Sequence, residues 1–220
     1  LLLWELMLKE KTNVLGIPFY RFYFNKSKID KIKKIIESQP FTKNPKNYIW
    51  AYTKDEGMQK MLHDLPELRS FFGWVHECLQ EVAKDLKLTV PLEVNSSWCN
   101  MNGKGDSFHG HTHPNAFVSS NYYVSGWKKD HTVWHLLNPY FGNNIFPLSQ
   151  KDYSNEEYDL KHLEPTEPGK YIVFPPKIFH YAQPNTKDET RYTIAANAFP
   201  NGLISCGGTN ELNLKLQSKK

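Results

Sequence analysis

Hydrophobic and polar positions divide the chain into a helical first part and a strand-rich remainder. Between residues 64 and 86 the large apolar side chains recur at helical spacing. They are Leu68, Phe71, Phe72, Val75, Leu79, Val82 and Leu86. The pattern predicts a long amphipathic helix that begins near Asp64-Leu-Pro-Glu67, lies on a sheet and uses its aromatic residues as core.

A strand and a shorter helix are predicted before it. Residues 14–24 have strand composition, and Pro18 indicates an edge strand or a bulge. Ser27 is placed to cap a helix whose four isoleucines fall on one stripe and which ends before Pro40. Residues 41–60 are expected to form a loop with one short strand.

From residue 92 onward, short runs of apolar or alternating residues are separated by Gly, Pro and Asn. We expect strands at 92–100, 107–113, 116–124, 132–137, 158–163, 170–174, 178–183 and 191–198, with a further one at 211–216. Such closely spaced strands after a helical layer predict a mostly β fold, a sandwich or barrel carrying helices on one side. At 220 residues we expect one domain. Its parts would be a supporting strand and helices (1–90), a β core (91–200) and a tail (201–220).

Composition and charge narrow the classes of partner. The net charge of +4 is spread along the chain, and its densest basic run, 28–34, carries isoleucines at helical spacing, as a solvated helix face does. We therefore expect no nucleic-acid partner. The apolar opening, residues 1–8, is too short to span a bilayer and is broken by Glu5, so no membrane partner is expected. Cysteines at 78, 99 and 206 form no disulfide framework, which favours a reducing, cytoplasmic location.

The first candidate for chemistry is a histidine cluster in the predicted strand 107–113. Histidines stand at positions 109, 111 and 113. Side chains two apart in a strand point the same way, so the three imidazoles should share one face, which can hold a metal ion. A cluster of surface histidines without metal is the alternative.

A second candidate lies about seventy residues downstream, where a Pro-Gly turn, an apolar strand and a Pro-Pro corner precede His180. A lone histidine in an aromatic segment is often a core residue. Yet a metal can join strands that are distant in sequence and adjacent in a barrel, so His180 is also a plausible third ligand.

Polar residues also fall on the predicted interior face of two strands. Arg191 shares its face with Thr193, Ala195 and Asn197, and a guanidinium placed inside a barrel is costly without an anion. Arginine binds carboxylates through two parallel hydrogen bonds, so a ligand that carries a carboxylate is the natural partner. An exposed arginine or a structural salt bridge is the alternative. The shared face of Ser119, Asn121 and Tyr123 adds a polar lining that fits a wet cavity.

Four motifs occur in order: His111-Thr-His113-Pro-Asn, then Ser-Ser-Asn-Tyr-Tyr-Val (119–124), then Phe-Pro-Pro-Lys-Ile-Phe-His180, then Arg191. Together, over about residues 97–199, they resemble the double-stranded β-helix Fe(II)/2-oxoglutarate oxygenases. The resemblance is strongest to the subgroup with His-x-His-Pro-Asn. It implies a jelly-roll, cupin-like barrel behind an N-terminal helical layer.

The resemblance also implies roles for individual residues. His111, His113 and His180 would hold Fe(II), and Arg191 and Tyr123 would bind the far carboxylate of 2-oxoglutarate. The same cavity would be lined by Asn100, Asn121 and Asn197. The family at large has a carboxylate at position 113, so three neutral imidazoles would leave the iron one unit more positive. Residues 109 and 111 are an alternative pair, but Pro-Asn follows 113 as in the family pattern.

The function implied is oxidation by O2, with hydroxylation of an unidentified protein side chain or small metabolite and release of succinate and CO2. The long stretch 138–159 is predicted to be a lid at the cavity mouth. Two other functions remain open. One is a three-histidine, cupin-type metal dioxygenase that does not use 2-oxoglutarate, and the other is a non-catalytic barrel that serves as a binding module.

Overall fold

The computed structural model describes residues 8–14, 16–43, 51–53, 61–136, 161–205 and 211–216. The N-terminal elements are β1 (Leu8–Val14), β2 (Ile17–Tyr23), η1 (Lys26–Lys28), α1 (Ile29–Glu37), β3 (Phe41–Lys43), β4 (Ala51–Thr53), η2 (Leu62–Asp64), η3 (Pro66–Leu68) and α2 (Arg69–Asp85). The strands that follow are β5 (Leu92–Asn102), β6 (Phe108–His111), β7 (Val118–Tyr123), β8 (His131–His135), β9 (Lys161–Pro165), β10 (Lys170–Phe174), β11 (Phe179–Ala182), β12 (Arg191–Pro200), β13 (Gly202–Ser205) and β14 (Glu211–Leu214). The predicted lid at 138–159 and Cys206 lie outside the described residues.

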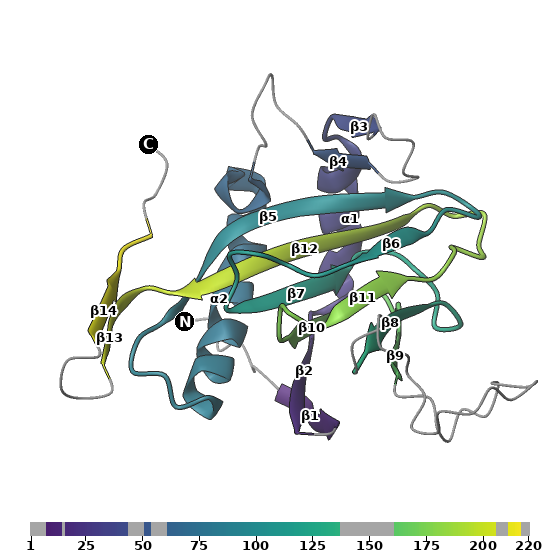
Figure 1. Cartoon of the computed structure of the whole chain (residues 1–220). Helices are drawn as coiled ribbons and strands as arrows, with labels where there is room; N and C mark the ends of the chain where they lie inside the picture. The colour runs from purple at the N-terminus through teal and green to yellow at the C-terminus, as the bar shows by residue number, and fades with distance from the viewer. Residues whose placement is uncertain are drawn as a thin grey trace, which may run out of the picture.

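Strands β5 to β12 are divided between two antiparallel sheets, and they change sheet at every step except from β8 to β9. The large sheet has the order β1-β2-β10-β7-β12-β5-β4-β3, and the small sheet has the order β6-β11-β8-β9. Four of these eight strands lie side by side in each sheet, which is the jelly-roll, or double-stranded β-helix, arrangement. Figure 1 shows both helices on one side of the large sheet and the β13–β14 hairpin projecting beyond the end of β12. The predicted fold class is confirmed.

Two predicted helix starts are wrong. Helix α2 begins at Arg69 rather than near Asp64, because Leu65, the residue before Pro66, is extended, as proline requires of its predecessor. Two short 3-10 turns therefore precede the helix. Ser27 lies inside η1 and caps nothing; Asn25 is the cap, and its Oδ1 accepts a hydrogen bond from the Ser27 backbone N–H.

The strand predictions hold better than the helix starts. Each strand expected between 92 and 198 is present, with ends shifted by a few residues. The expected strand at 14–24 becomes β2, which turns back onto the unpredicted β1 at Gly16 (φ +79°). Residues 41–60 contribute two short strands instead of one, and these extend the large sheet beyond β5.

The core has two layers. The layer between the helices and the large sheet holds the aromatic residues of α2, including Phe71 and Trp74, packed against Phe24 and Tyr122. Their prediction as core is confirmed. A smaller cluster lies between the two sheets: Phe19, Tyr123, Trp134, Ile172 and Phe174. Cys78 and Cys99 are buried free thiols. No helix in the described part of the chain has the length and apolar character that crossing a bilayer requires.

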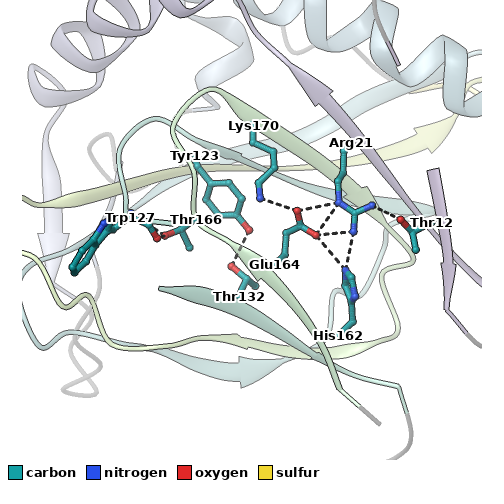
Figure 2. Close-up of polar contacts among 9 residues, drawn as sticks. All are labelled: Thr12, Arg21, Tyr123, Trp127, Thr132, His162, Glu164, Thr166 and Lys170. Atoms are coloured by element: carbon teal, nitrogen blue, oxygen red, sulfur yellow. Dashed lines mark hydrogen bonds and ion pairs between the residues drawn. The ribbon is translucent and has the colours of Figure 1, made fainter. Parts of the chain in front are cut away.

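A buried ion cluster joins the two sheets where β2 and β10 face β9 (Figure 2). The Arg21 Nε atom lies 3.0 and 2.9 Å from the two carboxylate oxygens of Glu164, and the Lys170 Nζ lies 2.7 Å from Oε1. Burial raises the pKa of Glu164, but hydrogen bonds from His162, Arg21 and Lys170 outweigh it and hold this pKa at about 2. The carboxylate is therefore charged at neutral pH.

Acid should remove the stability that this cluster contributes. Because the folded-state pKa of Glu164 is depressed from 4.5 to about 2, the contribution is present above pH 4.5 and is lost as the pH falls toward 2. We expect Glu164→Gln to lower the free energy of unfolding by about 3 kcal/mol at pH 7, since it leaves buried cations unpaired. Urea unfolding between pH 7 and 3 should show the difference from wild type shrinking below pH 4.5.

The matched control is Asp85→Asn, which breaks the half-exposed ion pair with Lys11. Such surface pairs contribute about 0–1 kcal/mol. A Glu164→Gln effect that stays constant as the pH falls would contradict the assignment of a charged, stabilising carboxylate.

Candidate active site

Three histidines from two distant parts of the chain meet between the sheets. His111 ends β6 and is the register partner of His180 on β11, while His113 follows two residues after β6 ends. One ring nitrogen from each lies within 4.8 Å of the others, and the Nε2 atoms of His113 and His180 are 3.2 Å apart. This grouping is the one predicted from the sequence.

Hydrogen bonds to backbone carbonyl oxygens orient these side chains. The carbonyl oxygens of His109 and Ile178 lie 2.9 Å from the Nδ1 atoms of His111 and His180, respectively. A carbonyl only accepts, so each Nδ1 carries the proton and each Nε2 keeps a free lone pair. The His113 backbone N–H donates to the carbonyl of Pro176, so the Pro-Pro corner fixes the loop that carries the third ring.

Gly110, between His109 and His111, leaves room for the side chain of Phe179. A Cβ at this position would lie 2.1 Å from Cζ of Phe179, the residue before His180. The ring of Phe179 therefore occupies the space that any other side chain at 110 would fill. This contact holds β6 and β11 together next to the histidines.

Burial keeps the three imidazoles neutral. It lowers the pKa of each, and together with the neighbouring imidazoles it brings the pKa of His113 to about 3 and that of His180 well below its usual range. Neutral imidazole is the form that binds metal ions. Three such nitrogens suit iron, zinc, copper or nickel.

His109 stands apart from this group. Its side chain is exposed and its ring stacks on Phe108 at 4.9 Å. The prediction that one strand presents all three imidazoles is wrong, because β6 ends at His111 and His113 reaches the group from the following loop. The pair at 111 and 113 is the one that meets His180.

A cavity opens beside the histidines. It is lined by Trp98, Asn100, Asn102, Phe108, His111, His113, Asn121, Thr132, Thr166, His180, Ala182, Arg191, Thr193 and Ala195. The predicted residues Asn100, Asn121 and Arg191 are therefore placed together with the histidines. Trp98 stacks on His113, with ring centroids 5.7 Å apart.

Two predicted residues lie behind the cavity wall. The hydroxyl of Tyr123 donates to Oγ1 of Thr132 at 2.9 Å, and Tyr123 is 1% exposed. The side chain of Asn197 hydrogen-bonds His113 and accepts from the Ser119 hydroxyl. Thr132 and Thr166 were not predicted. Only the alternation of Thr132 with the inward-facing Trp134 in the predicted strand 132–137 points to the first of them.

Arg191 is buried in the cavity wall with an incomplete set of partners. It is 1% exposed; its Nη2 donates to the carbonyl of Gln183 at 2.8 Å, and its Nη1 has no partner. Burial lowers its pKa, and the more distant charge of Asp130 acts in the opposite direction. Within the described part of the chain, no carboxylate forms an ion pair with it. Asn100 Oδ1 is also buried and unpaired.

Residues 96–197 match the model of a protein family described as "Putative 2OG-Fe(II) oxygenase". No curated protein sequence matches the chain significantly.

Solved structures with the same fold include SnoN, a non-haem α-ketoglutarate-dependent epimerase from nogalamycin biosynthesis, at 10% identity and a TM-score of 0.60 over 91% of each chain. HygX from Streptomyces hygroscopicus, crystallised with nickel, 2-oxoglutarate and hygromycin B, gives 12% identity and a TM-score of 0.58 over 83% of this chain and 82% of its own. A prolyl-4-hydroxylase from Pseudomonas putida gives 10% identity and a TM-score of 0.56 over 84% of this chain and 93% of its own. At these identities the likeness shows the fold.

Proposed function

We propose that the chain is a 2OG-Fe(II) oxygenase, the family whose model residues 96–197 match. In this proposal His111, His113 and His180 hold the iron, and Arg191 binds the far carboxylate of 2-oxoglutarate. The observation that carries the second assignment is the buried, unpaired Nη1 of Arg191 in the cavity that the histidines line. A buried cation without an anion is costly, and a carboxylate ligand would supply the missing partner.

His113 and His180 are spaced to share one metal ion, and the three neutral imidazoles are a suitable set of donors for it. Two nitrogens bound to one ion at about 2.0–2.1 Å each lie about 2.8–3.4 Å apart for coordination angles between octahedral and tetrahedral values. The Nε2 atoms of His113 and His180 are 3.2 Å apart. Asn197 hydrogen-bonds His113 and orients its ring, as outer-shell partners of metal ligands do.

Bound iron and 2-oxoglutarate supply the oxidation of a substrate by O2, with succinate and CO2 as products. The chain's own residues do the rest: three imidazoles hold the metal, Arg191 orients the cosubstrate, and Asn100 and Asn121 line the same cavity. We propose that the outcome is hydroxylation. The substrate would be a protein side chain or a small metabolite; one structural neighbour is a prolyl hydroxylase and another was crystallised with hygromycin B. The buried free thiols of Cys78 and Cys99 favour a reducing, cytoplasmic location.

An anaerobic titration tests this function without knowledge of the substrate. Adding 2-oxoglutarate to the protein with ferrous iron should produce the visible charge-transfer band of the chelated keto acid. Succinate, which has no keto group, is the control and should produce none. Iron bound without a band would contradict the use of 2-oxoglutarate and favour the three-histidine dioxygenase. Absence of iron binding would favour the non-catalytic binding module.

A further inference from the structure

A chain of buried contacts connects the ion cluster to the cavity (Figure 2). Glu164 Oε1 accepts a hydrogen bond from Lys170 Nζ, and that same Nζ lies 5.8 Å from the centroid of the Tyr123 ring. The hydroxyl of Tyr123 in turn donates to Thr132 Oγ1. Thr132 lines the cavity together with Arg191. The contacts therefore run from a fixed carboxylate in the protein interior to the wall where a ligand carboxylate would bind.

The direction of the Tyr123 hydrogen bond decides what Thr132 can do. Tyr123 is fully buried, and its hydroxyl donates to Thr132 Oγ1 at 2.9 Å. A threonine oxygen that accepts this bond still has its own hydrogen to donate. No acceptor for that hydrogen is found among the described residues. A carboxylate bound by Arg191 would be a suitable acceptor.

Lys170 is held so that it supports Tyr123 and does not compete for the ligand. It is 2% exposed, and its hydrogen bond to Glu164 is 2.7 Å long. A buried ammonium packed within about 6 Å of an aromatic ring is attracted to the ring face, which restrains the ring. Arg21, on the other side of Glu164, donates both to Glu164 and to Thr12.

We propose that Glu164 and Lys170 are positioning residues for the carboxylate-binding end of the cavity, where they fix Tyr123, Tyr123 orients Thr132, and Thr132 donates to the carboxylate that Arg191 binds. This inference rests on the proposed function, since the carboxylate is that of 2-oxoglutarate. It gives Tyr123 an indirect role: it acts through Thr132 and not by direct contact.

The test is the affinity for 2-oxoglutarate, measured anaerobically by the charge-transfer band on protein saturated with ferrous iron. Thr132→Val, which keeps the shape and removes the hydroxyl, should weaken 2-oxoglutarate binding about tenfold or more, as expected for a lost hydrogen bond to a charged group. Thr132→Ser should restore affinity to within about threefold of wild type. Lys170→Met should weaken it severalfold, and should add less than about twofold when Thr132 is already valine.

Arg21→Met is the matched control, because it disrupts the same ion cluster without touching Tyr123. It should lower stability while leaving the affinity of the folded protein for 2-oxoglutarate unchanged within about twofold. Wild-type affinity in Thr132→Val, additive effects of Lys170→Met and Thr132→Val, or equal losses in Lys170→Met and Arg21→Met would each overturn the proposal. If Lys170→Met does not fold, the Val and Ser variants of Thr132 decide it. A wild-type protein that gives no band would instead refute the proposed function.

Discussion

Replacing His180 with alanine is expected to abolish iron binding and turnover. His180 is 3% exposed, and its Nε2 is the atom that faces the Nε2 of His113. Changes in the partners of metal ligands already cost about 10–100-fold in affinity, so loss of a ligand should cost more than about 100-fold. In wild type, ferrous iron at 100 times its dissociation constant should stabilise the fold by about 2.7 kcal/mol. Anaerobic thermal unfolding should show this shift in wild type and none in His180→Ala.

His109→Ala is the matched control, because His109 precedes His111 by two residues and lies outside the group of three. It should bind iron as wild type does, whereas His113→Ala should lose iron like His180→Ala. Unfolding of the metal-free variants in urea separates a lost ligand from a lost fold, since His180 also packs against Trp134 and Phe174. Loss of iron in His109→Ala with retention in His113→Ala would mean that 109 and 111 are the ligand pair.

Short sequence motifs were enough to predict which residues face the site. Alternation placed Arg191, Thr193 and Ala195 on one face, and that face lines the cavity. The motif order suggested that His180 joins His111, but the pairing itself depends on β11 lying next to β6 in the small sheet. Spacing along the chain does not encode that neighbour relation, because it results from the path of the whole jelly roll.

The ion cluster was not predictable in the same way. Arg21, Glu164 and Lys170 stand in short strands, where a charged residue ordinarily indicates the solvent face. Each instead points inward, and both cations donate to Glu164, which lies 143 positions after Arg21 and 6 positions before Lys170. In the sequence, a buried charged residue cannot be distinguished from an exposed one unless its partner is known.

Tyr123 shows what strand parity predicts and what it does not. Its parity with Asn121 correctly predicted that it faces the interior, but its hydroxyl reaches Thr132. Tyr123 packs in one buried cluster with Phe19, Trp134 and Phe174. Sequence parity gives the face, and packing gives the depth.

Arg191→Met is expected to weaken 2-oxoglutarate binding without destabilising the metal-free protein. Truncating one partner of a buried, hydrogen-bonded charge pair costs about 2–5 kcal/mol, which predicts a loss in affinity of at least about 30-fold. Without the ligand, by contrast, the guanidinium is buried with Nη1 unpaired, and its pKa is lowered by burial. Methionine would remove that desolvation cost while filling similar volume.

A loss of affinity for 2-oxoglutarate without a loss of folding stability is therefore expected only if Arg191 binds the ligand. The free energy of unfolding of metal-free Arg191→Met, from urea titration, should equal or exceed that of wild type, while the charge-transfer titration requires far more 2-oxoglutarate. Arg69→Met, an exposed arginine at the start of α2, should change neither. A structural arginine would give the reverse result, with several kcal/mol of stability lost and cosubstrate affinity retained. A buried charge that is paired only in the bound state destabilises the ligand-free protein, and binding of the carboxylate removes that destabilisation.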